Sequence, residues 1–254
     1  MNYAIETAPL DSLKYDCLIL GVYQDLQLSA TTHSINISTK GLINTIVSRG
    51  DINGKNGETV LINAIPDNPI ERILLVGLGE NKPLTSKNYR KALLAAINSL
   101  KKTNIKSILC CLADVEVIDA NQQWKTRQII EVFNDAIYQF TAYKSNKEIT
   151  SKIEKIGIFS PEAELISTQL GLNQGRAIAD GMNLTKLLGD LPGNICTPSY
   201  LAEQAFELGK KYPSIDISIL EENDMEKLNM GAFLSVSRGS RQPAKLITLN
   251  YQGG

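Results

Sequence analysis

Histidine is the side chain most often used for acid–base and zinc chemistry near neutral pH, and this chain has one, His33. It lies in the polar stretch Ser29–Ser38. A serine–histidine–aspartate triad needs one histidine, but the GxSxG turn that presents the nucleophile is absent from the sequence. A zinc site built from several histidines is excluded. We therefore interpret His33 as a solvated loop residue.

Acidic side chains are plentiful but scattered. The 27 Asp and Glu residues form no dense cluster of the kind that a two-metal site needs. Asp180 and Asp190 lie ten residues apart near one face of a predicted helix. We interpret both as solvated side chains on the helix surface. The sequence therefore predicts no catalytic, no cofactor-binding and no metal-binding residue in this chain.

Two short motifs resemble ligand loops without completing them. Gly77–Gly79 lies between a predicted strand and a predicted helix, as a phosphate-binding turn would, but Lys82 replaces the third glycine. We interpret it as a plain strand-to-helix turn. Asp51–Glu58 has the composition of a calcium loop, but Lys55 occupies a ligand position and Asn56 the position of the obligatory glycine. We predict a hairpin loop there.

The cysteines and the N-terminus indicate the compartment. None of the four cysteines forms a CxxC pair, and three lie in or beside apolar runs, where a thiol acts as a small hydrophobic group. The first 16 residues contain no apolar signal segment, and no stretch approaches the 18 apolar residues of a membrane span. We expect a reduced, soluble, cytoplasmic protein with no membrane contact. The cysteines are Cys17, Cys110, Cys111 and Cys196.

The charge balance gives no indication of a nucleic-acid partner. The chain has 26 basic and 27 acidic residues, for a formal net charge of −1. Basic residues recur in Lys144–Lys155 and at Arg238, Arg241 and Lys245, but no aromatic side chains alternate with them. We predict solvated faces there rather than a nucleic-acid groove.

The first 159 residues alternate between strand and helix patterns. Helical spacing of apolar residues occurs in Thr85–Lys102 and Trp124–Tyr143. Such alternation predicts an α/β domain with a parallel or mixed sheet over residues 1–159. Short apolar runs that we predict as strands are Cys17–Val22, Thr59–Ala64, Ile73–Leu78, Ile105–Leu112 and Lys155–Phe159.

A long connecting helix is predicted over residues 160–190. Ser160 and Pro161 suit the N-cap and first helical positions. Gly171 and Gly175 lie four residues apart inside it, and each costs about 1 kcal/mol relative to alanine. Glycines at that spacing favour a close packing contact.

The sequence pattern of residues 191–254 predicts the first elements of a second α/β domain. A helix begins at Thr197-Pro198, with Leu201, Ala205 and Leu208 as its core face. Alternating isoleucines in Ile215–Ile219 and the apolar run Leu246–Tyr251 predict strands. About sixty residues are few for an independent core, so we expect this segment not to fold alone. Two short helices are predicted at Asn223–Leu228 and Gly231–Val236.

Three blocks of the last eighty residues resemble the leucyl (cytosol) aminopeptidases, a family of metal-dependent peptidases. In order they are GRAIADGMNLTKLLGDLPGNICTPSYLAEQA from Gly175, EENDMEKLNMGAFLSVSRGS from Glu221, and LITLNYQGG from Leu246. The resemblance is weaker before Gly175, where the order of elements and the spacing GETVLI…ILLVGLG fit. It implies that residues 1–159 form a domain similar to macro domains and that residues 191–254 begin the catalytic domain.

The resemblance also implies an activity. Members of the family use two divalent ions, zinc, manganese or magnesium, to generate a hydroxide nucleophile and to polarise the peptide carbonyl. Their lysine, aspartate, glutamate and arginine catalytic residues follow the strand that resembles LITLNYQGG, so no catalytic role transfers to a residue of this chain. We expect the 254-residue chain alone to be inactive. Full-length members form homohexamers and act on peptides, and we expect no defined hexamer from this chain.

A second hypothesis remains open at this point. The macro-like domain would act as a stand-alone module that binds a nucleotide or another protein. Ligand loops of that kind are rich in glycine and face the phosphate, and Gly77–Gly79 is the one candidate in the sequence. Titration with ligands similar to ADP-ribose would separate the two hypotheses.

Overall fold

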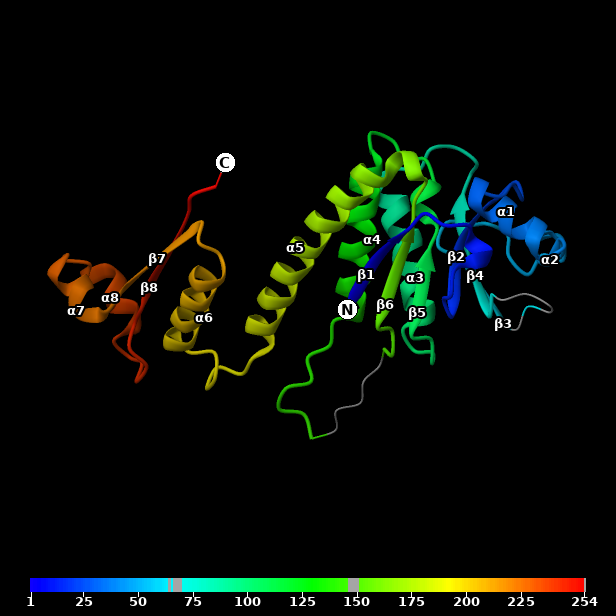
Figure 1. The fold of residues 1–254 in the computed structure, drawn as a ribbon. Helices are drawn as coiled ribbons and strands as arrows, with labels where there is room; N and C mark the ends of the chain where they lie inside the picture. Colours follow the sequence, from blue (N-terminus) through cyan, green and yellow to red (C-terminus); the bar gives the residue numbers. More distant parts are fainter. Residues whose placement is uncertain (64, 66–69, 146–150, 254) are drawn as a thin grey trace. The chain divides into compact units, whose positions relative to one another are not determined.

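The computed structural model describes residues 1–63, 65, 70–145 and 151–253 (Figure 1). The chain divides into two compact units, Met1–Leu184 and Thr185–Gly254. Both units combine strands with helices, which confirms the predicted α/β class. Each unit is described by itself.

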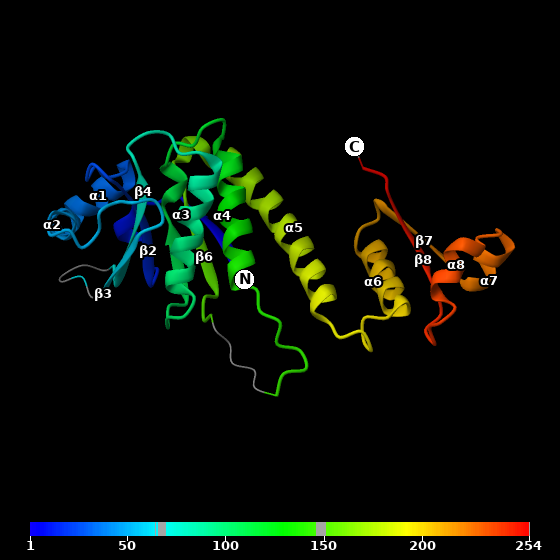
Figure 2. The ribbon, with the colours of Figure 1, turned by 180° about the vertical axis from the view of Figure 1, so that it is seen from behind.

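The first unit is built on a six-stranded mixed sheet with the order β1-β6-β5-β2-β4-β3 (Figures 1 and 2). Its first five strands are parallel, and only the edge strand β3 runs antiparallel, paired with β4. Edge strand β1 was not predicted, because its five residues form no apolar run. The strands are β1 (Asn2–Glu6), β2 (Cys17–Tyr23), β3 (Thr59–Asn63), β4 (Arg72–Gly79), β5 (Ser107–Cys110) and β6 (Lys155–Phe159).

Helices cover the sheet on both faces, because side chains of each buried strand alternate between two cores. Cys17 and Ile19 of β2 belong to one cluster, whereas Leu18 and Leu20 belong to the other. The first cluster lies under α3 (Ser86–Leu100), α4 (Gln122–Ile137) and part of α5 (Leu165–Asp190). The second lies under α1 (Ala30–Ser38) and α2 (Leu42–Ser48). The described residues of this unit also include the 3₁₀ turns η1 (Leu10–Ser12), η2 (Leu112–Asp114) and η3 (Glu162–Glu164).

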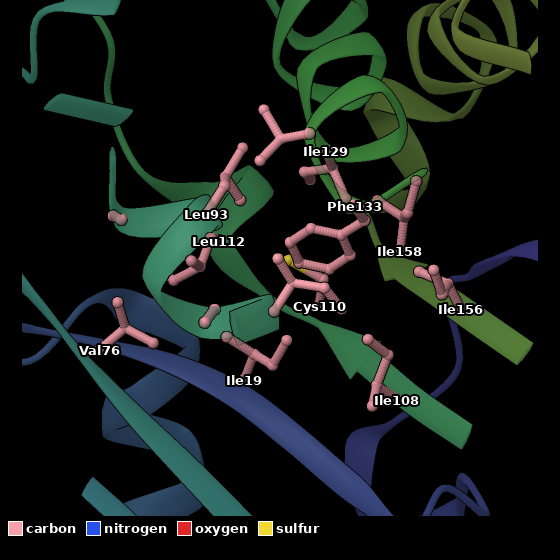
Figure 3. Packing of buried hydrophobic residues seen from close by; sticks show 14 of the residues in the cluster. Ile19, Val76, Leu93, Ile108, Cys110, Leu112, Ile129, Phe133, Ile156 and Ile158 are labelled. Carbon is pink, nitrogen blue, oxygen red and sulfur yellow. The ribbon is translucent and has the colours of Figure 1, made fainter. Parts of the chain in front are cut away.

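The first cluster is the larger of the two (Figure 3). Phe133 of α4 packs above the sheet among side chains of β5 and β6, with Leu93 of α3 beside it (Figure 3). Tyr89 and Phe133 are its largest fully buried side chains. This cluster makes the helices α3 and α4 integral to the fold of the unit.

Two helix predictions need correction. Helix α4 ends at Ile137 rather than Tyr143, because Tyr138 takes an extended backbone with ψ of 133°. Ser160 does not cap a helix: its hydroxyl bonds Thr168 Oγ1 at 2.7 Å, and η3 separates it from the start of α5 at Leu165. The apolar spacing was correct in both regions, but local backbone geometry set the ends.

Helix α5 packs closely on α4 through two glycines. A Cβ atom added at Gly171 would lie 2.3 Å from the carbonyl oxygen of Gln123, and one at Gly175 would lie 2.9 Å from Ile130. The predicted close-contact role of these glycines is confirmed. Asn134 of α4 and Asn183 of α5 exchange side-chain amide hydrogen bonds of 2.9 and 3.2 Å, which hold the same pair of helices together.

The second unit is a two-stranded sheet with three helices. Strands β7 (Ile215–Leu220) and β8 (Leu246–Tyr251) pair antiparallel. Helix α6 (Pro198–Lys211) contacts β7, where a Cβ at Gly209 would meet Ile217 at 2.6 Å. Its buried residues are Ala202 and Ala205, whereas Leu201 is 38% exposed, so the predicted core face of α6 was partly wrong. Helices α7 (Glu222–Lys227) and α8 (Gly231–Ser237) cover a small cluster of Met225, Leu234 and Ala244.

Candidate functional site

The carboxyl ends of parallel strands are the usual ligand site of α/β sheets. Here that edge holds a polar cluster centred on Asp114, at the end of η2 behind β5. Its Oδ2 accepts hydrogen bonds from the Ser29 hydroxyl and from the backbone N–H of Thr31, each at 3.0 Å. Ser29 is the residue that caps α1, and Thr31 lies in its first turn. Asp114 therefore supplies the negative charge that a helix N-terminus favours.

The hydroxyl of Thr32 ties the start of α1 to strand β2. Thr32 donates to the carbonyl oxygen of Gly21 at 2.9 Å, and its Oγ1 lies 2.9 Å from Ser29 Oγ. Ser29 is the N-cap of α1 and accepts from the N–H of Thr32. Ser29, Thr32 and Asp114 Oδ2 are bonded within the protein, whereas Asp114 Oδ1 is buried without a hydrogen-bond partner among the described residues. An incoming anion would have to displace Asp114.

Lys125 of α4 contributes a partly buried cation near the same carboxylate. Its Nζ donates to the carbonyl oxygens of Ala113 and Val115 at 2.6 and 3.1 Å. Burial lowers the pKa of Lys125, and the nearby Asp114 opposes that shift. Bonds to two carbonyl groups fix this amine as a support for η2, and no nucleophile is bonded to it.

Sequence reasoning missed Asp114 and Lys125. The one available signal was the position of Asp114 directly after the apolar run that contains β5. Neither residue belongs to a recognisable motif, and the contacts of Asp114 join segments more than eighty residues apart. Only the tertiary structure brings these segments together.

His33 lies on a helix rather than in a loop, which corrects the prediction of its setting. It is exposed on α1, as expected for a solvated side chain. The polar stretch around it was predicted as a loop because its helix has few apolar residues. Ser29, Thr32 and Asn36 of this stretch are buried through hydrogen bonds instead.

The acidic residues remain scattered after folding. Within the part of the chain that the structure describes, no three His, Cys, Asp or Glu side chains come together as a metal site would require. Asp180 and Asp190 are exposed on the surface of α5. The described residues therefore offer no ligand set for a pair of divalent ions.

The glycines of Gly77–Gly79 serve backbone packing. The backbone N–H of Gly77 donates to the backbone carbonyl oxygen of Glu58 at 2.8 Å. The backbone N–H of Gly79 donates to the backbone carbonyl oxygen of Gly54, also at 2.8 Å. A Cβ at Gly77 would lie 2.1 Å from the carbonyl oxygen of Lys55, so the backbone of β4 packs directly against the loop before β3. Gly77–Gly79 is the end of strand β4, so the prediction of a strand-to-helix turn was wrong, and these contacts give no support to the nucleotide-binding hypothesis.

The segment Asp51–Glu58 connects α2 to β3 and is not a hairpin loop as predicted. Its closing contact is the carboxylate of Glu58, which accepts from the N–H groups of Asn53 and Lys55 at 2.9 and 3.1 Å. The hairpin partner of β3 is β4, which follows it in the chain.

Three of the cysteines are buried and behave as small hydrophobic groups. Burial raises the pKa of Cys17 and of Cys110 to about 12, and it raises that of Cys111 well above its ordinary value. Such thiols stay protonated at neutral pH and are poor nucleophiles. Cys196 is partly exposed, and all four thiols are free.

The predicted basic faces are only partly solvated. Lys155 pairs with Glu6 at 3.4 Å and lies over the ring of Tyr15 at 4.3 Å. Lys245 is mostly buried and pairs with Glu221. Arg238 and Arg241 are exposed, as expected. The segment Lys144–Lys155 lies partly outside the described residues.

The described surface has cavities that could hold a small ligand. One of about 430 Å³ lies between η1, α1 and the end of β6, and one of about 610 Å³ lies beside Gly79 and the start of α3. A third of about 360 Å³ lies in the second unit between Pro198 and the end of α8. None of the three is lined by a histidine, a cysteine or an aspartate. The geometry of these described surfaces therefore assigns no reaction to them.

Among the described residues, no helix is both long and apolar enough to cross a membrane.

Comparison with known proteins supplies the identity. The N-terminal domain of the cytosol aminopeptidase family matches residues 19–147, and the catalytic domain of that family matches residues 183–254. The two matches cover both structural units.

Curated relatives are similar over the whole chain. A probable cytosol aminopeptidase of Nitrosospira multiformis is 39% identical over 259 residues, which cover 100% of this chain and 50% of that protein. The cytosol aminopeptidase of Pseudomonas aeruginosa is 35% identical, over 100% of this chain and 51% of that protein. The chain thus spans about half the length of the curated relatives it matches.

Solved structures show the same fold at lower identity. A variant of tomato leucine aminopeptidase superposes with a TM-score of 0.79 at 21% identity, covering 99% of this chain and 51% of that one. The bottromycin maturation enzyme BotP in complex with Mn gives a TM-score of 0.72 at 19% identity, covering 94% of this chain and 45% of that one. With both of its units matched in order by domains of one family, the chain belongs to the cytosol aminopeptidase family.

Proposed function

We propose that this chain forms the N-terminal half of a metal-dependent leucyl aminopeptidase, which removes N-terminal amino acids from peptides. The observation that carries the proposal is the match of residues 183–254 to the catalytic domain of the family. The identity of 35–39% to proteins named cytosol aminopeptidase, across the entire chain, supports it.

Two divalent ions are part of the proposal for the whole enzyme. Bound manganese, zinc or magnesium would supply an activated water and polarise the peptide carbonyl. The described residues offer no ligand set for such ions, so no step of the reaction is assigned to a side chain of this chain. A structural neighbour with Mn bound supports a metal requirement in related proteins.

The role of these residues is then structural. We assign residues 1–159 to an N-terminal domain similar to macro domains, 160–190 to the connecting helix and 191–254 to the beginning of the catalytic domain. The close α4–α5 contact at Gly171 and Gly175 supports a rigid attachment of the helix to the first domain. The protein would act in the cytoplasm, and the whole enzyme would assemble as a homohexamer that this chain alone does not form.

Limited proteolysis tests the division. A stable fragment that ends within the connecting helix is expected, with rapid cleavage after residue 190. Equal protection of residues 191–254 in isolation would contradict the assignment.

An activity assay tests the function. The 254-residue chain should not hydrolyse leucine p-nitroanilide in the presence of manganese. The same chain joined to the C-terminal half of the Nitrosospira multiformis relative should hydrolyse it, and chelation should abolish the activity. The full-length relative is the positive control. An inactive but folded fusion, beside an active control, would count against the proposal.

A further inference from the structure

The second hydrophobic cluster of the first unit borders a cavity between η1 and α1. The cavity has a volume of about 430 Å³ and is bounded by Leu10 of η1, Ile35 of α1 and Phe159 at the end of β6. Leu10 and Ile35 are buried members of the cluster, and Phe159 packs against it. The cavity therefore reaches the core of this unit through the seam between η1 and α1.

The size and the lining of this cavity are those of a small-molecule site. Ligand pockets typically measure about 300–1,000 Å³ and are mainly apolar, with a few polar groups. An apolar cavity of about 150 Å³ holds a benzene ring, so this one has room for two fused rings. Among the described residues that line it, none is charged. A charged group would lose its hydration there without gaining a partner, so the lining favours an uncharged ligand.

One wall of the cavity carries hydroxyl groups from a single face of α1. They belong to Thr31, Ser34 and Ser38, which are three and four residues apart. The Ser34 hydroxyl donates to the carbonyl oxygen of Ala30 at 3.3 Å, and the Ser38 hydroxyl donates to that of Ile35 at 3.0 Å. Because its proton is already used, Ser34 meets a ligand as a hydrogen-bond acceptor. This wall therefore suits a ligand that presents a donor.

Thr31 is the buried polar residue of this wall, and its side chain is unpaired. The residue is 7% exposed, and its backbone N–H is bonded to Asp114. The neighbouring hydroxyls of Ser29 and Thr32 are bonded within the protein, whereas that of Thr31 has no hydrogen-bond partner among the described residues. Its oxygen is not one of the fully enclosed unpaired atoms of those residues, so it stays open to the cavity. A buried hydroxyl without a partner costs free energy, which a ligand that donates to it recovers.

We propose that the cavity bounded by Leu10, Thr31, Ile35 and Phe159 binds a small uncharged molecule with a fused-ring apolar body and one N–H or O–H group that donates to Thr31. The apolar walls cover the ring, and the Thr31 hydroxyl sets its orientation. The site lies within the first unit, and binding there does not depend on the proposed peptidase function.

Titration with indole tests the proposal, because indole has two fused rings, no charge and one N–H donor. In backbone amide spectra of the isotope-labelled full chain, saturable shifts are expected at Leu10, Thr31 and Ile35. N-methylindole keeps the rings but lacks the donor, so it should bind about threefold to tenfold more weakly. The absence of saturable shifts at these amides would overturn the proposal, as would equal affinity for the two probes.

Two substitutions on α1 make the test specific. Thr31→Val keeps the shape of the side chain but removes the hydroxyl, so the affinity for indole should fall about threefold to tenfold while that for N-methylindole is unchanged. Ser34→Trp places a ring system in the cavity and should abolish binding of both probes. The matched control is Thr45→Val, which removes an exposed hydroxyl of α2 bonded to Gly41 and should leave both affinities unchanged.

Circular dichroism checks that all three variants fold. Indole binding that survives Ser34→Trp would refute the site. Equal losses of affinity for the two probes in Thr31→Val would refute the hydrogen bond to its hydroxyl.

Discussion

The two units of this protein differ in how their sheets are buried. Residues 1–184 place a six-stranded sheet between helices on both faces, with two hydrophobic clusters. Residues 185–254 have two strands and one small cluster of Met225, Leu234 and Ala244. Apolar burial is the main favourable term in folding, so the first unit should be far more stable.

The exposed side chains point to the same contrast. Val236 of α8 is 88% exposed, and Phe233, Leu249 and Tyr251 are also exposed. Apolar surface of this kind marks an interaction site or a weakness toward aggregation. The two units thus share a fold class but differ in how completely their hydrophobic cores are covered. Four predictions test this difference.

Loss of a core ring should have the largest effect. Phe133→Ala, at a fully buried position of α4, should lower the free energy of unfolding of the first unit by about 3–5 kcal/mol. Fluorescence of Trp124, the one tryptophan, reports on this unit during denaturant unfolding. Leu234→Ala in the second unit is the matched variant, and it should leave the Trp124 transition unchanged. A shift in that transition would show that the two units unfold together.

Filling the contact between α4 and α5 should cost less. Gly171→Ala should lower stability by about 1–3 kcal/mol, because the new methyl group would collide with the Gln123 backbone. Gly181→Ala, on the same helix with no atom within 4 Å of the added Cβ, should be neutral or stabilising by up to about 1 kcal/mol. The midpoints of denaturant unfolding compare the stabilities of the two variants. Equal destabilisation by both substitutions would show that the close contact at Gly171 is not the cause.

Alkaline pH should destabilise the first unit selectively. The raised pKa values of Cys17 and Cys110, about 12, mean that these thiols stay protonated in the folded state, whereas in the unfolded state they ionise near 9. Their stabilising effect is full below pH 9 and is lost as the pH rises toward 12. Between pH 9 and 10 the two thiols should together remove about 2 kcal/mol.

Other groups in the same unit modify this loss. The raised pKa values of Cys111 and Tyr89 act in the same direction, and the lowered pKa of Lys125 acts against them. Denaturant titrations at several pH values, followed by Trp124 fluorescence, measure the sum. A transition that does not move between pH 8 and 10 would contradict the burial of the thiols.

The polar cluster at the carboxyl edge should give the smallest effect. Asp114→Asn keeps the size of the side chain but removes the charge bonded to the first turn of α1, and should cost about 1 kcal/mol. Faster hydrogen exchange in α1, with α3 unchanged, is the expected signature. Tight phosphate binding by the unsubstituted protein at this turn would contradict the view that Asp114 closes it.

Sequence periodicity predicted the central strands and the helices α3 and α4, because their apolar residues repeat at the spacing of the element they form. It did not predict β1 or α1, whose residues are largely polar or half-buried. Asn36 of α1 is buried because its side chain accepts from the N–H of Asn44, and no local pattern encodes such a bond. The polar cluster of Asp114, Ser29 and Thr31 was missed for the same reason.

The sequence by itself determined the family, the α/β class and the absence of a dense group of metal ligands along the chain. These follow from residue types and their local order. The tertiary structure decided which face of each element is covered. The glycines at 171 and 175 form a helix contact because α4 lies against them. The apolar residues of β7 are half-buried, whereas Leu249 and Tyr251 of β8 are exposed. Burial depends on neighbours distant in sequence, so it could be established only from the folded chain.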